Sequence, residues 1–233
     1  MYFNQGDIDF FQQLEKNNSK RWFDENRKWF ELAVREPFRD LIDELLPEIK
    51  KLDEENHMES KDALFRVNRD LRFTPDKPPY KTHMAAGFSR GGRKSQYAGF
   101  YLQIGLKHII IGGGLPFMEK EVLRKIRIEI GYNKKAFQQL IEASDFKSLF
   151  GFVLGENEKE LPKTFLDIYK ENPLIANKQF YYGAIYKTEN WLFKENLSAH
   201  ILKHFQTGVN FNNFLIKAIC NFTKVDNVNS SRI

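Results

Sequence analysis

The sequence predicts a single α+β domain, in which a mostly antiparallel sheet is flanked by N-terminal and C-terminal helices. Apolar residues recur every three or four positions up to Leu52, which indicates amphipathic helices. They alternate with other residues through the middle of the chain, which indicates strands, and helical spacing returns near the end. Helices that precede and follow a run of strands are typical of an α+β fold. We expect this domain to span residues 1–223, followed by a frayed tail over residues 224–233.

The N-terminal third predicts several short helices rich in aromatic residues. Asp7 is placed to cap a first helix that carries Phe11 and Leu14 on one side. Ser19 is placed to cap the next helix.

The strongest helical stripe in the chain begins after Pro37, which suits the first turn of a helix. Its apolar members are Phe38, Leu41, Ile42, Leu45, Leu46, Ile49 and Leu52. Pro47 lies within the stripe, so we expect either a kink or a separate last turn. The polar run over residues 53–62 predicts a loop.

Residues 65–73 alternate apolar and polar side chains, with Arg69 the exception on the apolar side, which predicts a strand. A helical turn is the competing interpretation, because Arg66, Arg69 and Arg72 are three residues apart. Residues 74–79 contain three prolines and predict a stiff loop.

The sheet is predicted to continue with a short strand over residues 86–90 and a β-hairpin formed by residues 98–105 and 107–111. Three glycines at 112–114 are expected to end the hairpin. They lack the spacing of known phosphate loops, although they remain a candidate wall of an anion pocket. Residues 179–187 predict a further strand.

Helical spacing predicts a helix over residues 119–130, with Gly131 as its left-handed stop and Asn133 as the cap of the next helix. Residues 146–161 show no regular pattern. Two closing helices are expected, separated by Gly208.

Composition restricts where the protein acts. No run of about 18 apolar residues is present, so no membrane-spanning helix is expected. The N-terminus lacks a basic stretch followed by an apolar one, so no secretory signal is expected, and the lone Cys220 cannot form an intramolecular disulfide. Together these observations predict a cytoplasmic protein without membrane association.

The basic charge of the chain is concentrated in residues 65–94, which we call the basic window. It holds eight basic and two acidic side chains, a local balance of +6 against +5 for the whole chain. The basic residues are Arg66, Arg69, Arg72, Lys77, Lys81, Arg90, Arg93 and Lys94.

Guanidinium groups offer paired donors that match phosphate or carboxylate oxygens, so the basic window predicts a site for a phosphate-bearing or nucleotide-like small molecule. The predicted ligand-binding residues are Arg66, Arg69, Arg72, Lys77, Tyr80 and Lys81. Two alternatives stay open. Basic and aromatic residues interleaved in this way also suit a nucleic-acid-binding module. The arginines would instead serve a structural or interaction protein if all of them were paired internally.

An enzymatic role would need a proton acceptor and a donor in the same region. Asp70 and Asp76 are candidates for a base, and Tyr80 and His83 are candidates for an acid. A purely structural turn at Asp76 explains that residue equally well.

No cofactor is predicted, and no metal site. His200 and His204 share a helix face, but no glutamate and no third ligand accompany them.

The string FRVNRDLRFTPDKPPYKTH, which begins at Phe65, resembles the signature of an uncharacterised bacterial and fungal family known as domain of unknown function 2461. The signature positions are Arg66, Arg69, Asp70, Arg72, Phe73, Asp76, Lys77, Pro79, Tyr80 and Lys81. The stretches NNSKRWFDENRKWFE, GFYLQIG, IIIGGG and YGAIYK are similar to the same family, so the resemblance spans roughly residues 7–219. Leu115-Pro116 follows IIIGGG where the family leads us to expect a bulky aromatic residue. The resemblance implies no established activity, substrate or catalytic residue.

Overall fold

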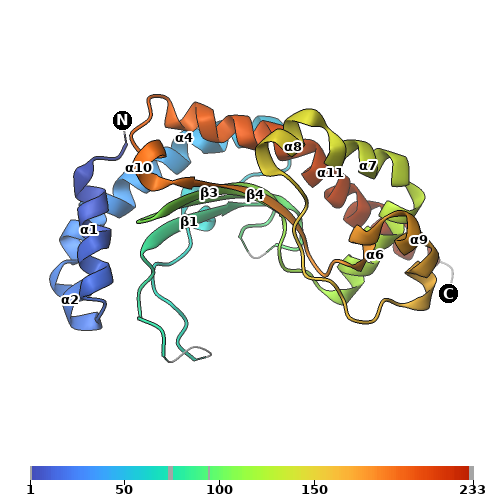
Figure 1. The fold of residues 1–233 in the computed structure, drawn as a ribbon, viewed down its shortest axis with the longest axis horizontal. Helices are drawn as coiled ribbons and strands as arrows, with labels where there is room; N and C mark the ends of the chain where they lie inside the picture. Colours follow the sequence, from blue (N-terminus) through green and yellow to red (C-terminus); the bar gives the residue numbers. More distant parts are fainter. Residues whose placement is uncertain (1, 73–75, 94, 231–233) are drawn as a thin grey trace. The chain divides into compact units, whose positions relative to one another are not determined.

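The computed structural model describes residues 2–72, 76–93 and 95–230, with side chains described as far as Asn221 (Figure 1). The chain forms two compact units. Unit 1 comprises Met1–Arg93, Tyr101–Ile111 and Ile185–Lys203, and unit 2 comprises Lys94–Phe100, Gly112–Ala184 and His204–Ile233. A single domain over residues 1–223 stays a prediction.

The predicted fold class is confirmed, because helices flank a four-stranded antiparallel sheet in which the strands pair in chain order (Figure 1). The strands are β1 (His83–Phe88), β2 (Gly99–Gly105), β3 (His108–Leu115) and β4 (Phe180–Lys187). The predicted hairpin corresponds to β2 and β3, which a two-residue turn connects.

Unit 1 contains a group of N-terminal helices with an aromatic core. Its helical elements are α1 (Gln5–Lys16), α2 (Lys20–Glu25), α3 (Arg27–Phe30), the π-helical turn η1 (Glu31–Arg35), α4 (Glu36–Leu52), α5 (Ser60–Ala63) and α10 (Thr188–Trp191). The ring of Phe10 is fully buried and lies 5.3 Å from Trp29 and 5.5 Å from Phe30, measured between ring centres. Rings at such distances stabilise a core beyond the area that they bury.

Helix α1 is capped by Asn4, so the prediction that Asp7 caps it is wrong. The Asn4 side chain accepts a hydrogen bond from the Gly6 backbone N–H at 2.7 Å, and the Asp7 carboxylate accepts one from the Asn4 backbone N–H. This reciprocal pair is a capping box, in which Asp7 occupies the third helical position. The predicted cap at Ser19 is confirmed, because its hydroxyl accepts from the Trp22 N–H at 3.3 Å.

Helix α4 buries five of the seven residues of the predicted stripe, leaves Leu46 and Leu52 partly exposed, and continues through Pro47 as far as Leu52. Pro47 is exposed, so water can satisfy the carbonyl that its missing N–H leaves without a partner.

The predicted strand over residues 65–73 does not form. An extended segment pairs with residues 79–86 only through isolated bridges, Leu64 with Ala86 and Asn68 with Tyr80. Pro78 and Pro79 have no N–H to donate, so a continuous ladder cannot develop opposite them. Residues 73–75 lie outside the described residues.

The helical elements of unit 2 are α6 (Lys120–Tyr132), α7 (Lys134–Glu142), α8 (Ser144–Phe150), the 3₁₀ turn η2 (Lys163–Phe165), α9 (Leu166–Glu171) and the 3₁₀ turn η3 (Pro173–Ala176). Helix α11 (Leu197–Ser230) begins in unit 1 and belongs to unit 2 from His204 onward. Helix α8 includes residues 146–150 of the segment 146–161, which was expected to be irregular. Helix α11 continues through residues 224–230 of the expected tail, and residues 231–233 lie outside the described residues.

Glycines explain the remaining differences between the predicted and the observed boundaries of helices and strands, because several of them provide space for packing within unit 2. A Cβ on Gly208 would overlap the Tyr182 side chain, so this glycine makes room for the ring within a helix. Helix α11 therefore runs unbroken where we expected Gly208 to separate two helices. A Cβ on Gly131 would lie 2.6 Å from Ile168 Cδ1, and α6 continues past Gly131 to Tyr132. A Cβ on Gly112 would overlap the Tyr182 backbone, and β3 includes all three glycines rather than ending before them.

Within the part of the chain that the structure describes, none of the helices combines the length and the hydrophobicity needed to cross a bilayer.

Candidate anion site

The extended segment around Tyr80 is anchored to the N-terminal helices of unit 1. The Asn18 side chain donates to the Tyr80 carbonyl at 3.0 Å and accepts from the Tyr80 N–H at 3.0 Å. The Tyr80 ring is buried and stacks on Phe23, with ring centres 4.0 Å apart. Tyr80, which we predicted as a ligand and as an acid, is therefore placed as an anchor of this segment.

Four side chains of this region form the basic cluster: Arg66, Arg69, Lys81 and His83. The ammonium group of Lys81 donates to the Arg66 carbonyl at 3.1 Å, and Arg69 Nε donates to the Tyr80 carbonyl at 3.4 Å. Among the described residues, no carboxylate lies within ion-pair distance of any of the four. The cluster therefore concentrates positive charge, and Asp70, which is paired with Arg72, acts on Arg66 only from beyond ion-pair distance.

The pKa values of the cluster reflect this concentration of charge. Burial, followed by the charges of Arg69 and Arg66, lowers the pKa of Lys81 from its ordinary value. Burial, followed by the charges of Lys81 and Arg69, lowers the pKa of His83 to about 4. His83 is therefore neutral at pH 7, and a bound anion would favour its protonated form.

Arg72 and Asp70, which were predicted as a ligand and a base, are paired with each other. Arg72 Nε lies 2.9 Å from Asp70 Oδ1, and Arg72 Nη2 lies 2.6 Å from Asp70 Oδ2. The hydrogen bonds from Arg72 lower the pKa of Asp70 to about 2. A carboxylate with so low a pKa is a weak base at neutral pH. Arg72 lies in a turn rather than on a strand face shared with Arg66.

Lys77 and Asp76 are exposed and follow the three residues outside the described chain. Neither makes a hydrogen bond or an ion pair with a described residue. The structure therefore does not bring them into the basic cluster, and their predicted roles stay predictions.

Two other basic residues of the window bind oxygen atoms elsewhere in unit 1. Arg90 forms an ion pair with the buried Asp53 at 2.6 Å, and Arg93 donates to the Asp62 carbonyl at 2.7 Å. Arg90 and Arg72 are thus paired within the chain, whereas the basic cluster forms no ion pair among the described residues, and a purely structural role for the arginines stays a prediction. Lys94 lies outside the described residues.

The histidines of α11 differ in environment: His200 is exposed, whereas His204 is 3 % exposed and lies beside the Phe150 ring. In the described parts of the chain, no three His, Cys, Asp or Glu side chains group in a way that could hold a metal ion.

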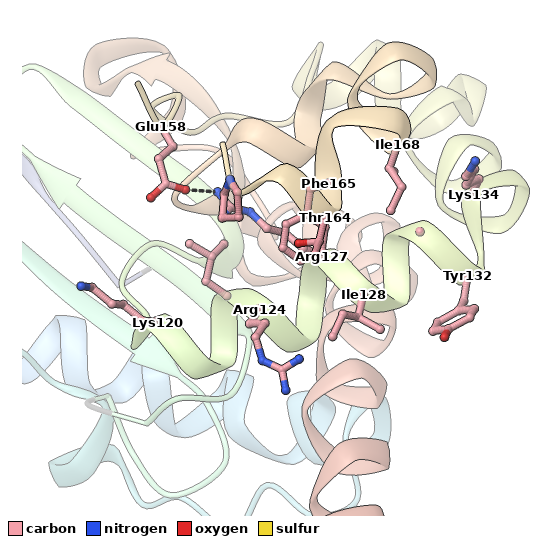
Figure 2. Close-up of a pocket in the computed structure, with 13 residues that line it drawn as sticks. Lys120, Arg124, Arg127, Ile128, Tyr132, Lys134, Glu158, Thr164, Phe165 and Ile168 are labelled. Carbon is pink, nitrogen blue, oxygen red and sulfur yellow. Dashed lines mark hydrogen bonds and ion pairs between the residues drawn. The ribbon is translucent and has the colours of Figure 1, made fainter. Parts of the chain in front are cut away.

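A cavity of about 730 Å³ lies in unit 2, between α6 and the segment that contains η2 and α9 (Figure 2). We did not predict it from the sequence. Its signal was the spacing of Lys120, Arg124 and Arg127, which places three basic residues on one face of a helix. The opposite wall comes from residues about 40 positions further along, and helical periodicity does not identify it.

Fold and site together define an α+β protein whose basic cluster, without an ion pair among the described residues, lies on extended segments of unit 1. Residues 7–214 match the family described as Conserved hypothetical protein (DUF2461), and the chain belongs to that family. The resemblance seen in the sequence is thereby confirmed over nearly the whole chain. No match is found among curated proteins.

Proposed function

We propose that the basic cluster binds a small phosphate-bearing anion. The observation that carries the proposal is that Arg66, Arg69, Lys81 and His83 gather with no carboxylate of the described residues within ion-pair distance. Like charges held together raise the free energy of the site, and an anion that enters it relieves their repulsion.

The four side chains suit different parts of a phosphate group. The Arg66 guanidinium is exposed and makes no hydrogen bond with a described residue, so its paired N–H groups are available for two phosphate oxygens. Lys81 adds a point charge that its bond to the Arg66 carbonyl holds in place. His83 supplies one N–H donor when neutral and two when protonated.

Binding, rather than a reaction, is the function that we propose. Among the predicted acid–base residues, Asp70 is a weak base, Tyr80 is buried against Phe23, and Asp76 lies outside the basic cluster. A cytoplasmic location is part of the proposal, since a phosphorylated metabolite would be met there.

Thermal unfolding with added anions tests this proposal. With 10 mM inorganic phosphate and a Kd of about 1 mM, mass action adds about 1.4 kcal/mol, which raises the Tm by about 3–6 °C for a chain of this size. Nucleotides and sugar phosphates are tested alongside, with potassium chloride at matched ionic strength as the control. We expect Arg66→Gln to lose the shift and the matched variant Arg72→Gln, which removes an arginine paired with Asp70, to keep it.

The proposal fails if no phosphate compound shifts the Tm beyond the chloride control, or if Arg66→Gln retains the full shift. Titration with a fluorescent single-stranded oligonucleotide separates the nucleic-acid alternative. Binding that weakens steeply with salt and is shared by several exposed basic residues would favour that alternative over a single-anion site.

A further inference from the structure

The cavity of unit 2 differs from the basic cluster because it combines apolar walls with a buried arginine. Ile128 lies on the α6 side, and Phe165 and Ile168 come from the facing segment (Figure 2). Gly131 permits α9 to approach α6 closely, since a Cβ there would meet Ile168. A volume of about 730 Å³ with mostly apolar walls and a few polar groups is typical of small-molecule sites.

Arg127 is the polar group at the centre of this cavity. Its side chain is 4 % exposed and is held by hydrogen bonds from Nε to the Ile175 carbonyl at 2.8 Å and from Nη2 to Glu158 Oε2 at 2.6 Å. Nη2 also donates to the Asn177 carbonyl at 3.3 Å, and the guanidinium carbon lies 5.7 Å from the centre of the Phe165 ring. The guanidinium is therefore fixed in position before any ligand arrives.

One nitrogen of that guanidinium is left over. Nη1 of Arg127 makes no hydrogen bond with any described residue, and it is not fully buried, although the side chain as a whole is 4 % exposed and lines the cavity. A donor on a positively charged guanidinium that is already held in place bonds an anionic oxygen more strongly than a neutral donor does, so a carboxylate oxygen opposite Nη1 would be favoured.

Charge around the cavity selects the kind of anion. Lys120 lines the cavity at the start of α6, is exposed, and makes no ion pair with a described residue. Arg124 and Lys134 also line the cavity but pair on the surface with acidic neighbours. Glu158, whose side chain is partly exposed, neutralises the charge of Arg127. A doubly charged, strongly hydrated phosphate would lose most of its hydration against the apolar walls, whereas a singly charged carboxylate with an apolar body would lose less.

We propose that this cavity binds a small organic monocarboxylate with a flat, apolar body. The carboxylate accepts a hydrogen bond from Arg127 Nη1, Lys120 attracts it to the cavity, and the apolar body covers Ile128 and Phe165. This site lies in unit 2 and takes another class of ligand, so it does not depend on the anion site of unit 1.

Ligand-observed NMR and calorimetry with 2-naphthoate test the proposal, with 2-naphthamide as a neutral probe of the same shape. We expect saturable binding of naphthoate and at least tenfold weaker binding of the amide, since one charge-assisted hydrogen bond contributes about 1.4 kcal/mol or more. Inorganic phosphate is not expected to compete. Equal binding of the two probes, or displacement by phosphate, would overturn the ligand class.

Two tryptophan variants test the location. Thr164 is an exposed residue that lines the cavity, so Thr164→Trp fills the space without disturbing the core, and we expect naphthoate binding to be lost. Lys163→Trp adds the same side chain at the adjacent exposed position, which does not line the cavity, and binding is expected to persist. Unchanged naphthoate affinity in Thr164→Trp would refute the proposed site.

Arg127→Lys tests the hydrogen bond itself, because lysine keeps the positive charge beside Glu158 but has no atom equivalent to Nη1. We expect at least a tenfold loss of naphthoate affinity in a variant that circular dichroism shows to be folded. If Arg127→Lys does not fold, Lys120→Gln takes its place, with a smaller loss that added salt abolishes. Unaltered affinity in the variant used would overturn the role of charge in the site.

Discussion

The buried Asp7 makes the stability of unit 1 depend on pH, and Asp7→Asn tests this directly. The Asp7 side chain is 3 % exposed, and its Oδ1 atom is buried without a hydrogen-bond partner among the described residues. Burial raises the pKa of Asp7 from 3.8 to about 6, against the opposing effect of the bond from the Asn4 N–H. The folded protein therefore favours the protonated carboxyl.

The direction of the pH effect follows from linkage. Because the folded pKa lies above the unfolded one, the stabilisation from Asp7 is fully present below pH 3.8 and is lost as the pH rises to about 6. A difference of about two pKa units corresponds to about 3 kcal/mol of unfolding free energy. Asparagine has the same shape, does not titrate, and can still accept from the Asn4 N–H. We expect the free energy of unfolding of Asp7→Asn, relative to that of wild type, to rise by up to about 3 kcal/mol between pH 4 and pH 6.5.

Urea unfolding of both proteins at pH 4, 5, 6 and 7 measures this difference, and the titration of other carboxylates cancels in the comparison. Asp24→Asn supplies a control that titrates outside this pH range. Lys20 and Arg27 lower the pKa of Asp24, so its stabilisation is present above pH 3.8, and the difference between Asp24→Asn and wild type should change little from pH 4 to pH 7. A difference between Asp7→Asn and wild type that stays constant from pH 4 to pH 7 would refute the reasoning.

Three further predictions concern packing, an ion pair and the anion site. Gly208→Ala is expected to lower the unfolding free energy by about 3 kcal/mol or more, because the added methyl overlaps the Tyr182 side chain, and Tyr182→Phe should restore part of the loss in urea unfolding. Lack of any rescue would contradict the proposed overlap. Asp53→Asn is expected to lower the free energy of unfolding by about 2–4 kcal/mol, because it leaves the half-buried Arg90 without its carboxylate. A change below about 0.5 kcal/mol would show that the ion pair is not stabilising. Sulfate is expected to bind more tightly as the pH falls from 7 to 5, because bound sulfate raises the low pKa of His83 and its own charge is constant over this range. Calorimetry should show a smaller pH dependence of the sulfate affinity in His83→Gln than in wild type. An equal pH dependence would exclude His83 from the site.

Local patterns in the sequence predicted the elements whose structure depends on local interactions. The stripe of α4, the cap at Ser19 and the hairpin of β2 and β3 all follow from side chains close in sequence. The glycine at 208 was misinterpreted, because a glycine that makes room for a distant ring looks the same in the sequence as one that ends a helix. Its partner Tyr182 is 26 residues away in the chain, and only the folded structure brings the two together.

The basic window was evident from the sequence, but which of its residues form ion pairs in the fold was not. The sequence identified the basic window, yet it could not separate Arg66, which makes no ion pair with a described residue, from Arg90, whose partner Asp53 lies 37 residues earlier. Only tertiary contacts decide which cations are neutralised. The strand predicted over residues 65–73 would have placed Arg72 on one face with Arg66, but the prolines opposite prevent a continuous ladder, and Arg72 lies in a turn. Its role as a ligand stays a prediction.

The Asn18 side chain gives the extended segment around Tyr80 a protected edge. One side of this segment pairs with residues 67–69, through the bonds from Arg69 N–H to the Pro79 carbonyl and from Lys81 N–H to the Val67 carbonyl. On its other side, Asn18 occupies both the N–H and the carbonyl of Tyr80, as a neighbouring strand would. An incoming chain therefore finds no vacant donor or acceptor at this position, where exposed backbone beside a cluster of arginines would otherwise invite strand addition. The side-chain amide of Asn18, in the loop after α1, thus makes the two hydrogen bonds that a neighbouring strand would make.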